Sequence, residues 1–247
     1  MDDLLLYFIC GFIASLIDGS IGMAYGVSLT TILTTMGVPI LNASSTIHFC
    51  EIFTSFASGV SHFVNGNVDL NLLKRIMIPG ILGGFWGALL LIYASNYNLK
   101  PYVAGYLLIL GIVILIKVFR NKTMNSDNKG LIPLGFVGGF FDATGGGGWG
   151  PIVTSSLIVQ GHTPAKVVGT VNLAEFFVTV VQVAVFFTVV KFVSWQMALG
   201  FVLGGCIAAP LSAIFVKKIN SRILMVLVAI TLIIINLFVI VQSLGKG

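Results

Sequence analysis

Four acidic residues, Asp18, Glu51, Asp142 and Glu175, lie within stretches of the sequence that are otherwise apolar. They form two pairs, because Asp18 and Asp142, and likewise Glu51 and Glu175, are separated by 124 positions. A charged side chain at the centre of a bilayer costs about 2.5–3.5 kcal/mol by insertion scales, so in a membrane these residues must face a protein interior or a wet cavity. Burial favours the neutral form of a carboxyl group. Each glutamate is therefore a candidate proton carrier; the alternative is that it only bonds the backbone end of a broken helix.

Each glutamate belongs to a stripe of four polar residues spaced three, four and three positions apart, which places them on one helical face. The stripes are His48, Glu51, Ser55 and Ser58, and Asn172, Glu175, Thr179 and Gln182. We interpret His48 as a hydrogen-bond partner of Glu51 or as a titrating group that assists it. The two could share a metal ion, but Asn172 replaces the histidine in the second stripe and no Cys or His cluster completes a ligand set. We expect proton coupling by Glu51, Glu175 and His48, and no metal site.

Asp18 and Asp142 each precede a glycine-rich break, at 18–22 and 142–148. Aspartate accepts hydrogen bonds from free N–H groups at a helix start, so capping of the next half-helix is the expected role, with direct ion or proton handling as the alternative. The N-terminus of a half-helix also suits an anion. We therefore predict substrate binding by residues around the breaks and stripes: Ser20, Gly22, Thr46, Thr144, Gly146, Thr170 and Asn172. The conformational freedom of glycine could by itself explain the breaks.

These residues recur because the chain contains an internal duplication. Residues 11–56 and 135–180 align without a gap at a constant shift of 124. The match includes ionisable residues as well as glycines, such as Gly22 with Gly146. In a membrane protein, such a duplication is typical of a transporter built from two related halves, with its substrate site between them.

The composition places the two halves in a membrane. Of the 247 residues, 57% are hydrophobic and 9% are charged, whereas a soluble domain carries about 25% charged residues. We predict ten apolar segments: 4–17, 23–36, 43–64, 76–94, 101–119, 131–141, 149–160, 166–190, 196–215 and 221–242. The predicted fold is an all-α polytopic membrane protein with two inverted-topology repeats of about five helical segments each, the first two of each repeat being short and glycine-broken. The repeats are residues 1–120 and 131–247, joined by a cytoplasmic linker at 121–130.

Basic residues assign the sides of the membrane, since cytoplasmic loops carry an excess of Lys and Arg. Clusters at 74–75, 117–129 and 217–222 mark cytoplasmic loops, while the loops between them hold only Lys100 and Lys191. If each half crosses the membrane an odd number of times, the two halves have opposite orientations. Both termini then lie on the extracytoplasmic side of the cell membrane. The net charge of +5 is scattered over these loops, so nucleic-acid binding is not expected. The three isolated cysteines indicate neither a disulfide framework nor a zinc site.

The duplicated motif resembles the TauE/SafE family of sulfite exporters, also described as toluene sulfonate uptake permeases. The segments that carry the resemblance are 11–22 (GFIASLIDGSIG), 135–148 (GFVGGFFDATGGGG), Gly150-Pro151, and 169–172 (GTVN) with Glu175. The resemblance covers essentially the whole chain. It implies a secondary carrier of small anions, often sulfur oxyanions or organosulfonates. The first half departs from the second, with His48 in place of Asn172 and Val27 in place of Pro151.

We predict a secondary transporter that moves a small anion, of the sulfite or sulfonate class, across the cell membrane by alternating access with proton coupling and without a cofactor. An anion channel and a carrier of cations or metal ions remain alternatives. An enzyme is not expected, because the chain has neither an HExxH motif nor a GxSxG nucleophile elbow. The expected partners are the small anion, protons and the lipid bilayer.

Overall fold

The computed structural model describes residues 2–94, 100–119, 130–190, 195–218 and 221–244, and its regular elements within these ranges are helices. The first half contains α1 (Asp2–Ile21), α2 (Tyr25–Thr35), α3 (Ile40–Val64), α4 (Leu70–Tyr93) and α5 (Lys100–Phe119). The second contains α6 (Leu131–Gly145), α7 (Trp149–Val159), α8 (Pro164–Phe186), α9 (Trp195–Phe215), the short η1 (Val216–Lys218) and α10 (Ser221–Leu244). Within the described ranges the ten α-helices match the ten predicted segments in number and order. The predicted linker at 121–130 lies outside the described residues, apart from Gly130.

Four described stretches are long and apolar enough to cross a membrane: Leu4–Ile21, Leu70–Tyr93, Pro164–Phe186 and Trp195–Lys218. Helix α3 is longer, with 25 residues, but its polar stripe makes it less apolar. Helices α6 and α7 are shorter apolar helices. The described chain is therefore an all-helical protein with the spans of a polytopic membrane protein.

The two helix breaks lie one turn later than the sequence predicts. Segments 4–17 and 131–141 were expected to end before the aspartates, but α1 continues to Ile21 and α6 to Gly145. The helical bonding continues through Asp18, whose carbonyl accepts from Gly22 N at 2.5 Å. The helices end at Gly22 and Gly146, where φ is +74° and +69°. Such positive φ values strain residues with a side chain, so the breaks require glycine there.

Helix α9 packs against both α1 and α3, and the three helices run in the same direction. Residue numbers rise together along each contact: Gly11 with Phe201 and Gly19 with Ser212 between α1 and α9, and Cys50 with Ala198 and Thr54 with Gly205 between α3 and α9. The approach of α1 to α9 depends on glycine, because a Cβ at Gly11 would lie 2.5 Å from the carbonyl oxygen of Phe201.

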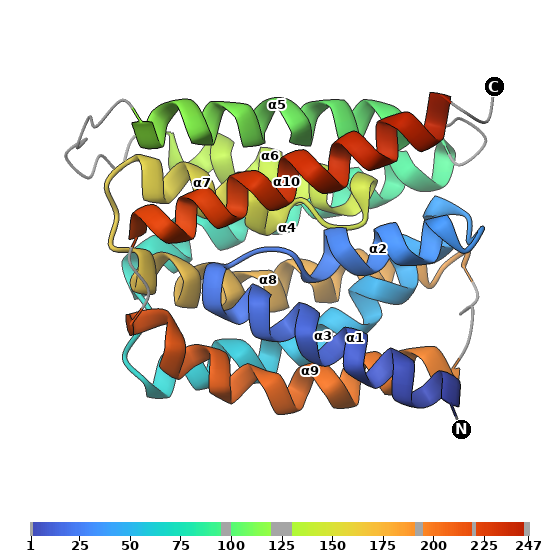
Figure 1. Cartoon of the computed structure of the whole chain (residues 1–247), viewed down its shortest axis with the longest axis horizontal. Coiled ribbons are helices and arrows are strands. Elements are labelled where there is room, and N and C mark those ends of the chain that lie inside the picture. Colours follow the sequence, from blue (N-terminus) through green and yellow to red (C-terminus); the bar gives the residue numbers. More distant parts are fainter. Residues whose placement is uncertain (1, 95–99, 120–129, 191–194, 219–220, 245–247) are drawn as a thin grey trace.

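Helices α4, α6 and α8 form an equivalent parallel group. Its contacts pair Gly135 with Ile76 and Gly139 with Gly80 between α6 and α4, and Gly80 with Val178 and Gly84 with Gln182 between α4 and α8. A Cβ at Gly135 would also lie 2.5 Å from a carbonyl oxygen, that of Ile76. The two groups consist of equivalent helices of the two halves. Helices α1 and α3 of the first half correspond to α6 and α8 of the second, and α9 of the second half corresponds to α4 of the first. The remaining long helices, α5 and α10, pack on each other and cover α7 (Figure 1).

The two ends of the molecule differ in charge. Both chain termini lie at the right-hand end in Figure 1. At the opposite end, Lys166 Nζ donates to Val68 O at 3.1 Å and Lys217 Nζ donates to Asn65 O at 2.5 Å. The exposed basic residues at that end include Lys74, Arg75, Lys166, Lys217 and Lys218.

Candidate functional site

The two polar stripes meet where α3 and α8 cross. Asn172 Nδ2 donates to Ser58 Oγ at 3.1 Å, while His48 and Gln182 both contact Asp142 Oδ2, at 3.2 and 2.9 Å. Early residues of one stripe thus lie beside late residues of the other, so α3 and α8 are antiparallel. All eight stripe residues are buried. Glu51 and Glu175, with exposed fractions of 3% and 7%, face the protein interior as expected.

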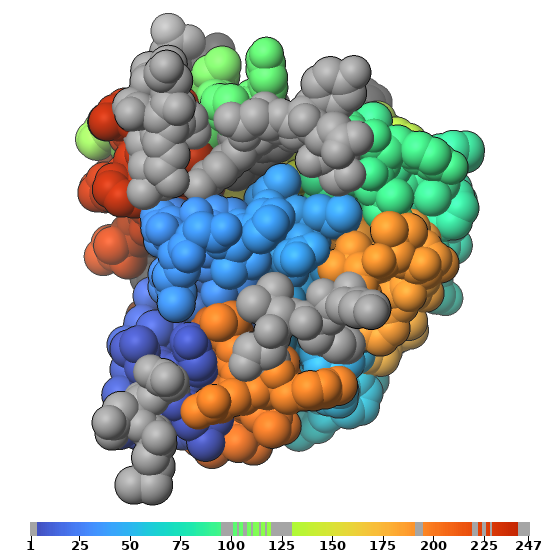
Figure 2. Space-filling model, turned by 90° about the vertical axis from the view of Figure 1, so that its right-hand side faces the viewer, coloured from blue at the N-terminus to red at the C-terminus, as the bar shows by residue number. Residues whose placement is uncertain are grey.

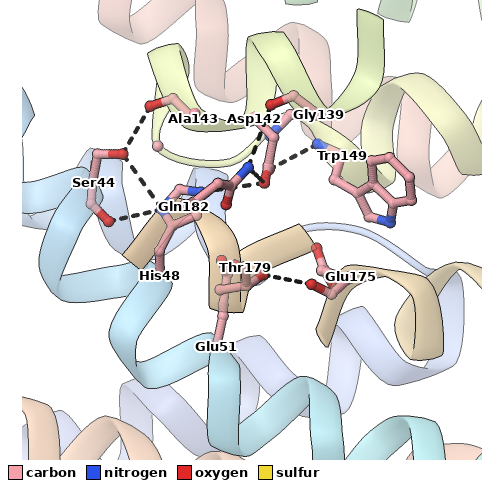
Figure 3. Close-up of polar contacts among 12 residues, drawn as sticks. Ser44, His48, Glu51, Gly139, Asp142, Ala143, Trp149, Glu175, Thr179 and Gln182 are labelled. Carbon is pink, nitrogen blue, oxygen red and sulfur yellow. Dashed lines mark hydrogen bonds and ion pairs between the residues drawn. The ribbon is translucent and has the colours of Figure 1, made fainter. Parts of the chain in front are cut away.

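Asp142, in the last turn of α6, has four hydrogen-bonding neighbours. Its Oδ1 accepts from the backbone N–H groups of Gly148 and Trp149, at 2.7 and 2.9 Å, where α7 begins. Its Oδ2 accepts from Gln182 Nε2 and faces His48 Nε2 (Figure 3). The carboxylate therefore spans the second break and ties α6, α7, α3 and α8 together.

His48 is held at both ring nitrogens. Its Nδ1 lies 2.7 Å from the carbonyl oxygen of Ser44, which can only accept, so Nδ1 carries a proton. Its Nε2 faces an Asp142 carboxylate that accepts three other N–H groups, and hydrogen bonds of this kind favour the ionised form. His48 Nε2 and Asp142 Oδ2 lie 3.2 Å apart in a buried site and form an ion pair when the ring is protonated. The expected pairing of His48 with Glu51 is thus wrong: the ring reaches across to the other half of the chain, where the carboxylate at the end of α6 meets it.

Asp18 occupies the equivalent position in the first half but has fewer partners. Its Oδ1 accepts from Tyr25 N at 3.3 Å, where α2 begins. Its side chain is half-buried, whereas Asp142 is 1% exposed. The residues equivalent to His48 and Gln182 are Asn172 and Ser58, which hydrogen bond to each other. The first half therefore repeats the cap across the break without the ion pair.

Three buried acceptor atoms at the crossing have no hydrogen-bond donor among the described residues: Glu51 Oε2, Asn172 Oδ1 and Gln182 Oε1. A buried polar atom left without a partner costs about 1–3 kcal/mol. Asp18 and Asp142 also lie within electrostatic range of both Glu51 and Glu175. A protonated carboxyl group supplies its own donor and removes one negative charge, so this environment suits carboxyl groups that take up and release protons.

The two helix breaks bind each other reciprocally. Thr30 Oγ1 donates to Gly146 O at 2.5 Å, and its equivalent, Thr154 Oγ1, donates to Gly22 O at 2.8 Å. This differs from the predicted anion cradle, because Gly22 and Gly146 follow the C-terminal ends of α1 and α6, where carbonyl groups prevail. The N–H groups that begin α2 and α7 instead face the carboxylates of the two aspartates.

The other predicted substrate residues are dispersed. Ser20 and Thr144 are buried in the last turns of α1 and α6, beside the breaks, and Asn172 lies at the crossing. The Thr46 hydroxyl donates to the carbonyl group one turn earlier in α3, at 2.8 Å. The Thr170 hydroxyl accepts from the backbone N–H of Asp69, which precedes α4, at 2.8 Å. The structure thus gives Thr46 and Thr170 backbone partners away from the crossing.

Sequence reasoning assigned no role to Gln182, Thr30 or Thr154. The signal for Gln182 was present, since it ends the second stripe at the position equivalent to Ser58. The signal for the threonines was their match at the constant shift of 124. Their contacts could not be predicted, because they join segments more than 100 residues apart.

Membrane-spanning helices, two facing helix breaks and buried carboxyl groups are features of a membrane transporter. The model of the sulfite exporter TauE/SafE family matches residues 7–239. The chain therefore belongs to this family and is a membrane transporter.

Two relatives from Bacillus subtilis (strain 168) agree with this assignment. The chain is 40% identical to the "Probable membrane transporter protein YtnM" over 246 residues, which cover 96% of this chain and 82% of the relative. It is 27% identical to the "Probable membrane transporter protein YdhB" over 165 residues, which cover 64% of this chain and 66% of the relative. No solved structure matches the fold significantly.

Proposed function

We propose that this protein is a secondary transporter that carries a small anion, a sulfur oxyanion or an organosulfonate, by alternating access. The observation that carries the proposal is the antiparallel crossing of α3 and α8, which brings Glu51 and Glu175 of two equivalent stripes into one buried region. The sulfite exporter description of the family supports the substrate class.

The helix directions support two inverted repeats. The parallel groups α1, α3, α9 and α4, α6, α8 exchange under a shift of five helices, and α3 of one group crosses α8 of the other in the antiparallel direction. Equivalent helices of the two halves therefore point in opposite directions, as in transporters that rock one repeat against the other. Residues 1–120 and 131–247 are the proposed repeats.

Glu51 and Glu175 are the proposed proton carriers, with His48 holding the second aspartate. Ionised glutamates would repel an anion that approaches the crossing, whereas protonated ones would not. Anion occupancy and protonation would then favour each other, which is the physical basis for coupling. Ser20, Thr144 and Asn172 are the predicted substrate residues nearest the breaks and the crossing.

The charge difference between the two ends supports a sidedness. The end that carries Lys74, Arg75, Lys166, Lys217 and Lys218 would face the cytoplasm by the positive-inside rule. Both termini, at the other end, would then lie on the extracytoplasmic side of the cell membrane (Figure 1).

A cation carrier is the second candidate, because four acidic side chains surround the crossing. Among the described residues no group of three or more His, Cys, Asp or Glu side chains is arranged to hold a metal ion. The cation substrates to test for this alternative are therefore monovalent cations and protons.

Counterflow in proteoliposomes tests the proposal. Vesicles that contain the full chain and concentrated unlabelled sulfite should transiently accumulate radiolabelled sulfite from a dilute outside solution, because a carrier exchanges one substrate for another. Methanesulfonate in excess should suppress the accumulation, and sodium or potassium chloride should not. Rapid equilibration without accumulation would indicate a channel, and cation counterflow without sulfite counterflow would replace the anion proposal with the cation carrier.

A further inference from the structure

A small pocket lies beside the second break, between α2 and the helices α5, α6 and α10. The space inside it that is open to the centre of a water-sized sphere is about 30 Å³. Its polar lining is formed by Thr30, Thr31, Thr34, Thr144 and Asn236. The described residues that line it include no acidic or basic side chain. The pocket therefore differs in chemistry from the acidic crossing of α3 and α8.

The pocket lies between the central breaks and the end of the molecule that carries both termini. Ile40 at the start of α3 and Ala104 near the start of α5 also line it. In Figure 1 the helix α2 runs from the centre towards that end. Figure 2 looks onto the same end, where α2 and the start of α3, in light blue, form the central part of the surface.

Three of the four hydroxyl residues have hydroxyl counterparts in the second half: Thr30 matches Thr154, Thr31 matches Ser155, and Thr144 matches Ser20. Thr34 corresponds to Ile158, and Gly145 corresponds to Ile21, at the shift of 124. Both isoleucines are buried in the apolar cluster that also contains Val118 of α5. The halves therefore differ at Thr34, whose hydroxyl lines the pocket, whereas its counterpart Ile158 lies in an apolar cluster.

The polar groups of the pocket can turn to a ligand at low cost. Thr31 and Thr34 donate their hydroxyls to the carbonyl groups one turn earlier, at 2.7 and 2.8 Å. Those carbonyls lie within α2 and keep their backbone N–H donors when a hydroxyl rotates away. Asn236 donates one N–H to Leu232 O at 2.8 Å, and an amide has further donor and acceptor capacity. Asn236 is buried within the apolar α10, where a polar side chain is costly in a membrane.

We propose that this pocket is an oxyanion subsite, where the sulfite or sulfonate group of the substrate binds before it reaches the central breaks. Thr31, Thr34 and Asn236 provide neutral hydrogen-bond donors, so the site binds an anion without the cost of burying a compensating charge. Thr30 links it to the break, because its hydroxyl contacts Gly146 O at 2.5 Å. This inference rests on the proposed function and specifies where the substrate is recognised.

Initial rates of radiolabelled sulfite uptake into proteoliposomes test the subsite. Thr34→Val and Asn236→Leu remove a donor each and should raise KM about tenfold while Vmax stays within about twofold. Thr34→Ser keeps the hydroxyl and should restore the parental KM. Thr35→Val is the matched control, because Thr35 makes the same kind of bond to its own helix (2.7 Å to Ile32 O) and does not line the pocket.

The outcomes separate this inference from the proposed function. Saturable sulfite uptake by the parent with an unchanged KM in Thr34→Val and Asn236→Leu would overturn the subsite and leave the transporter proposal standing. A parent protein without saturable uptake of sulfite or methanesulfonate would overturn both. Each variant is first checked for monodisperse elution, and Thr31→Val, at a half-buried position, replaces any variant that does not elute as folded protein.

Discussion

Asp18 and Asp142 occupy equivalent positions in the two halves, yet their surroundings differ. Asp142 accepts from two backbone N–H groups and from Gln182, and it faces His48 at 3.2 Å. Asp18 accepts from one backbone N–H group at 3.3 Å and is half-buried. The two aspartates share a capping geometry, but only the second also contacts the side chains of His48 and Gln182.

This difference shows that two equivalent positions of a duplicated sequence can acquire different side-chain partners. His48 of the first half contacts the aspartate of the second half and can neutralise it when protonated, whereas Asn172, its equivalent, cannot neutralise Asp18. The second break is therefore held by more side-chain bonds than the first. Three predictions, two about stability and one about proton coupling, follow from the comparison.

The largest stability difference is expected between Asp142→Asn and Asp18→Asn. Asp142→Asn leaves His48 without its buried counter-ion and should lower the free energy of unfolding by about 3 kcal/mol. Asp18→Asn retains a capping acceptor, since asparagine caps helices as well as aspartate does, and should cost less than about 1 kcal/mol. Unfolding by a denaturing detergent, followed by tryptophan fluorescence, measures both.

The double variant His48→Asn/Asp142→Asn provides the control for this comparison. Because the double variant removes both partners of the pair, its loss of unfolding free energy should be smaller than the summed losses of His48→Asn and Asp142→Asn. Equal losses in Asp18→Asn and Asp142→Asn, or strictly additive losses in the double variant, would show that the ion pair does not distinguish the halves.

A smaller and equal effect is expected where the halves are alike. Thr30→Val and Thr154→Val each remove one hydroxyl that bonds a glycine carbonyl across the breaks. Each should cost about 1 kcal/mol in the same unfolding measurement. Thr35→Val, whose hydroxyl bonds within its own helix, is the control and should have little effect. A loss in one of the two variants without a similar loss in its equivalent would contradict the reciprocal arrangement.

Much of this architecture could be predicted from the sequence, because periodicity and hydropathy act locally. The ten segments and the burial of both glutamates followed from apolar runs and from the cost of a charge in lipid. The helix ends at the breaks were one turn too early, since an aspartate can sit inside the last turn and still reach the next helix.

The partners across the molecule could not be predicted from the sequence. The pairing of His48 with Asp142, and of Thr30 with Gly146, depends on how α2 and α3 pack against α6. A pattern at a constant shift gives equivalent positions, but it does not say which equivalent residues meet. For the same reason the predicted cradle placed Gly22 and Gly146 at helix starts, whereas the fold places them at helix ends.

Proton movement during sulfite transport tests the role of the crossing most directly. A pH-sensitive dye inside proteoliposomes should report proton flux when the parent protein moves sulfite down its gradient. Glu51→Gln and Glu175→Gln mimic the protonated state, so each should lose most of this proton flux, and the double variant all of it, while exchange of sulfite for sulfite persists. Undiminished sulfite-driven proton flux in the double variant would contradict the assignment of these two glutamates as the proton carriers.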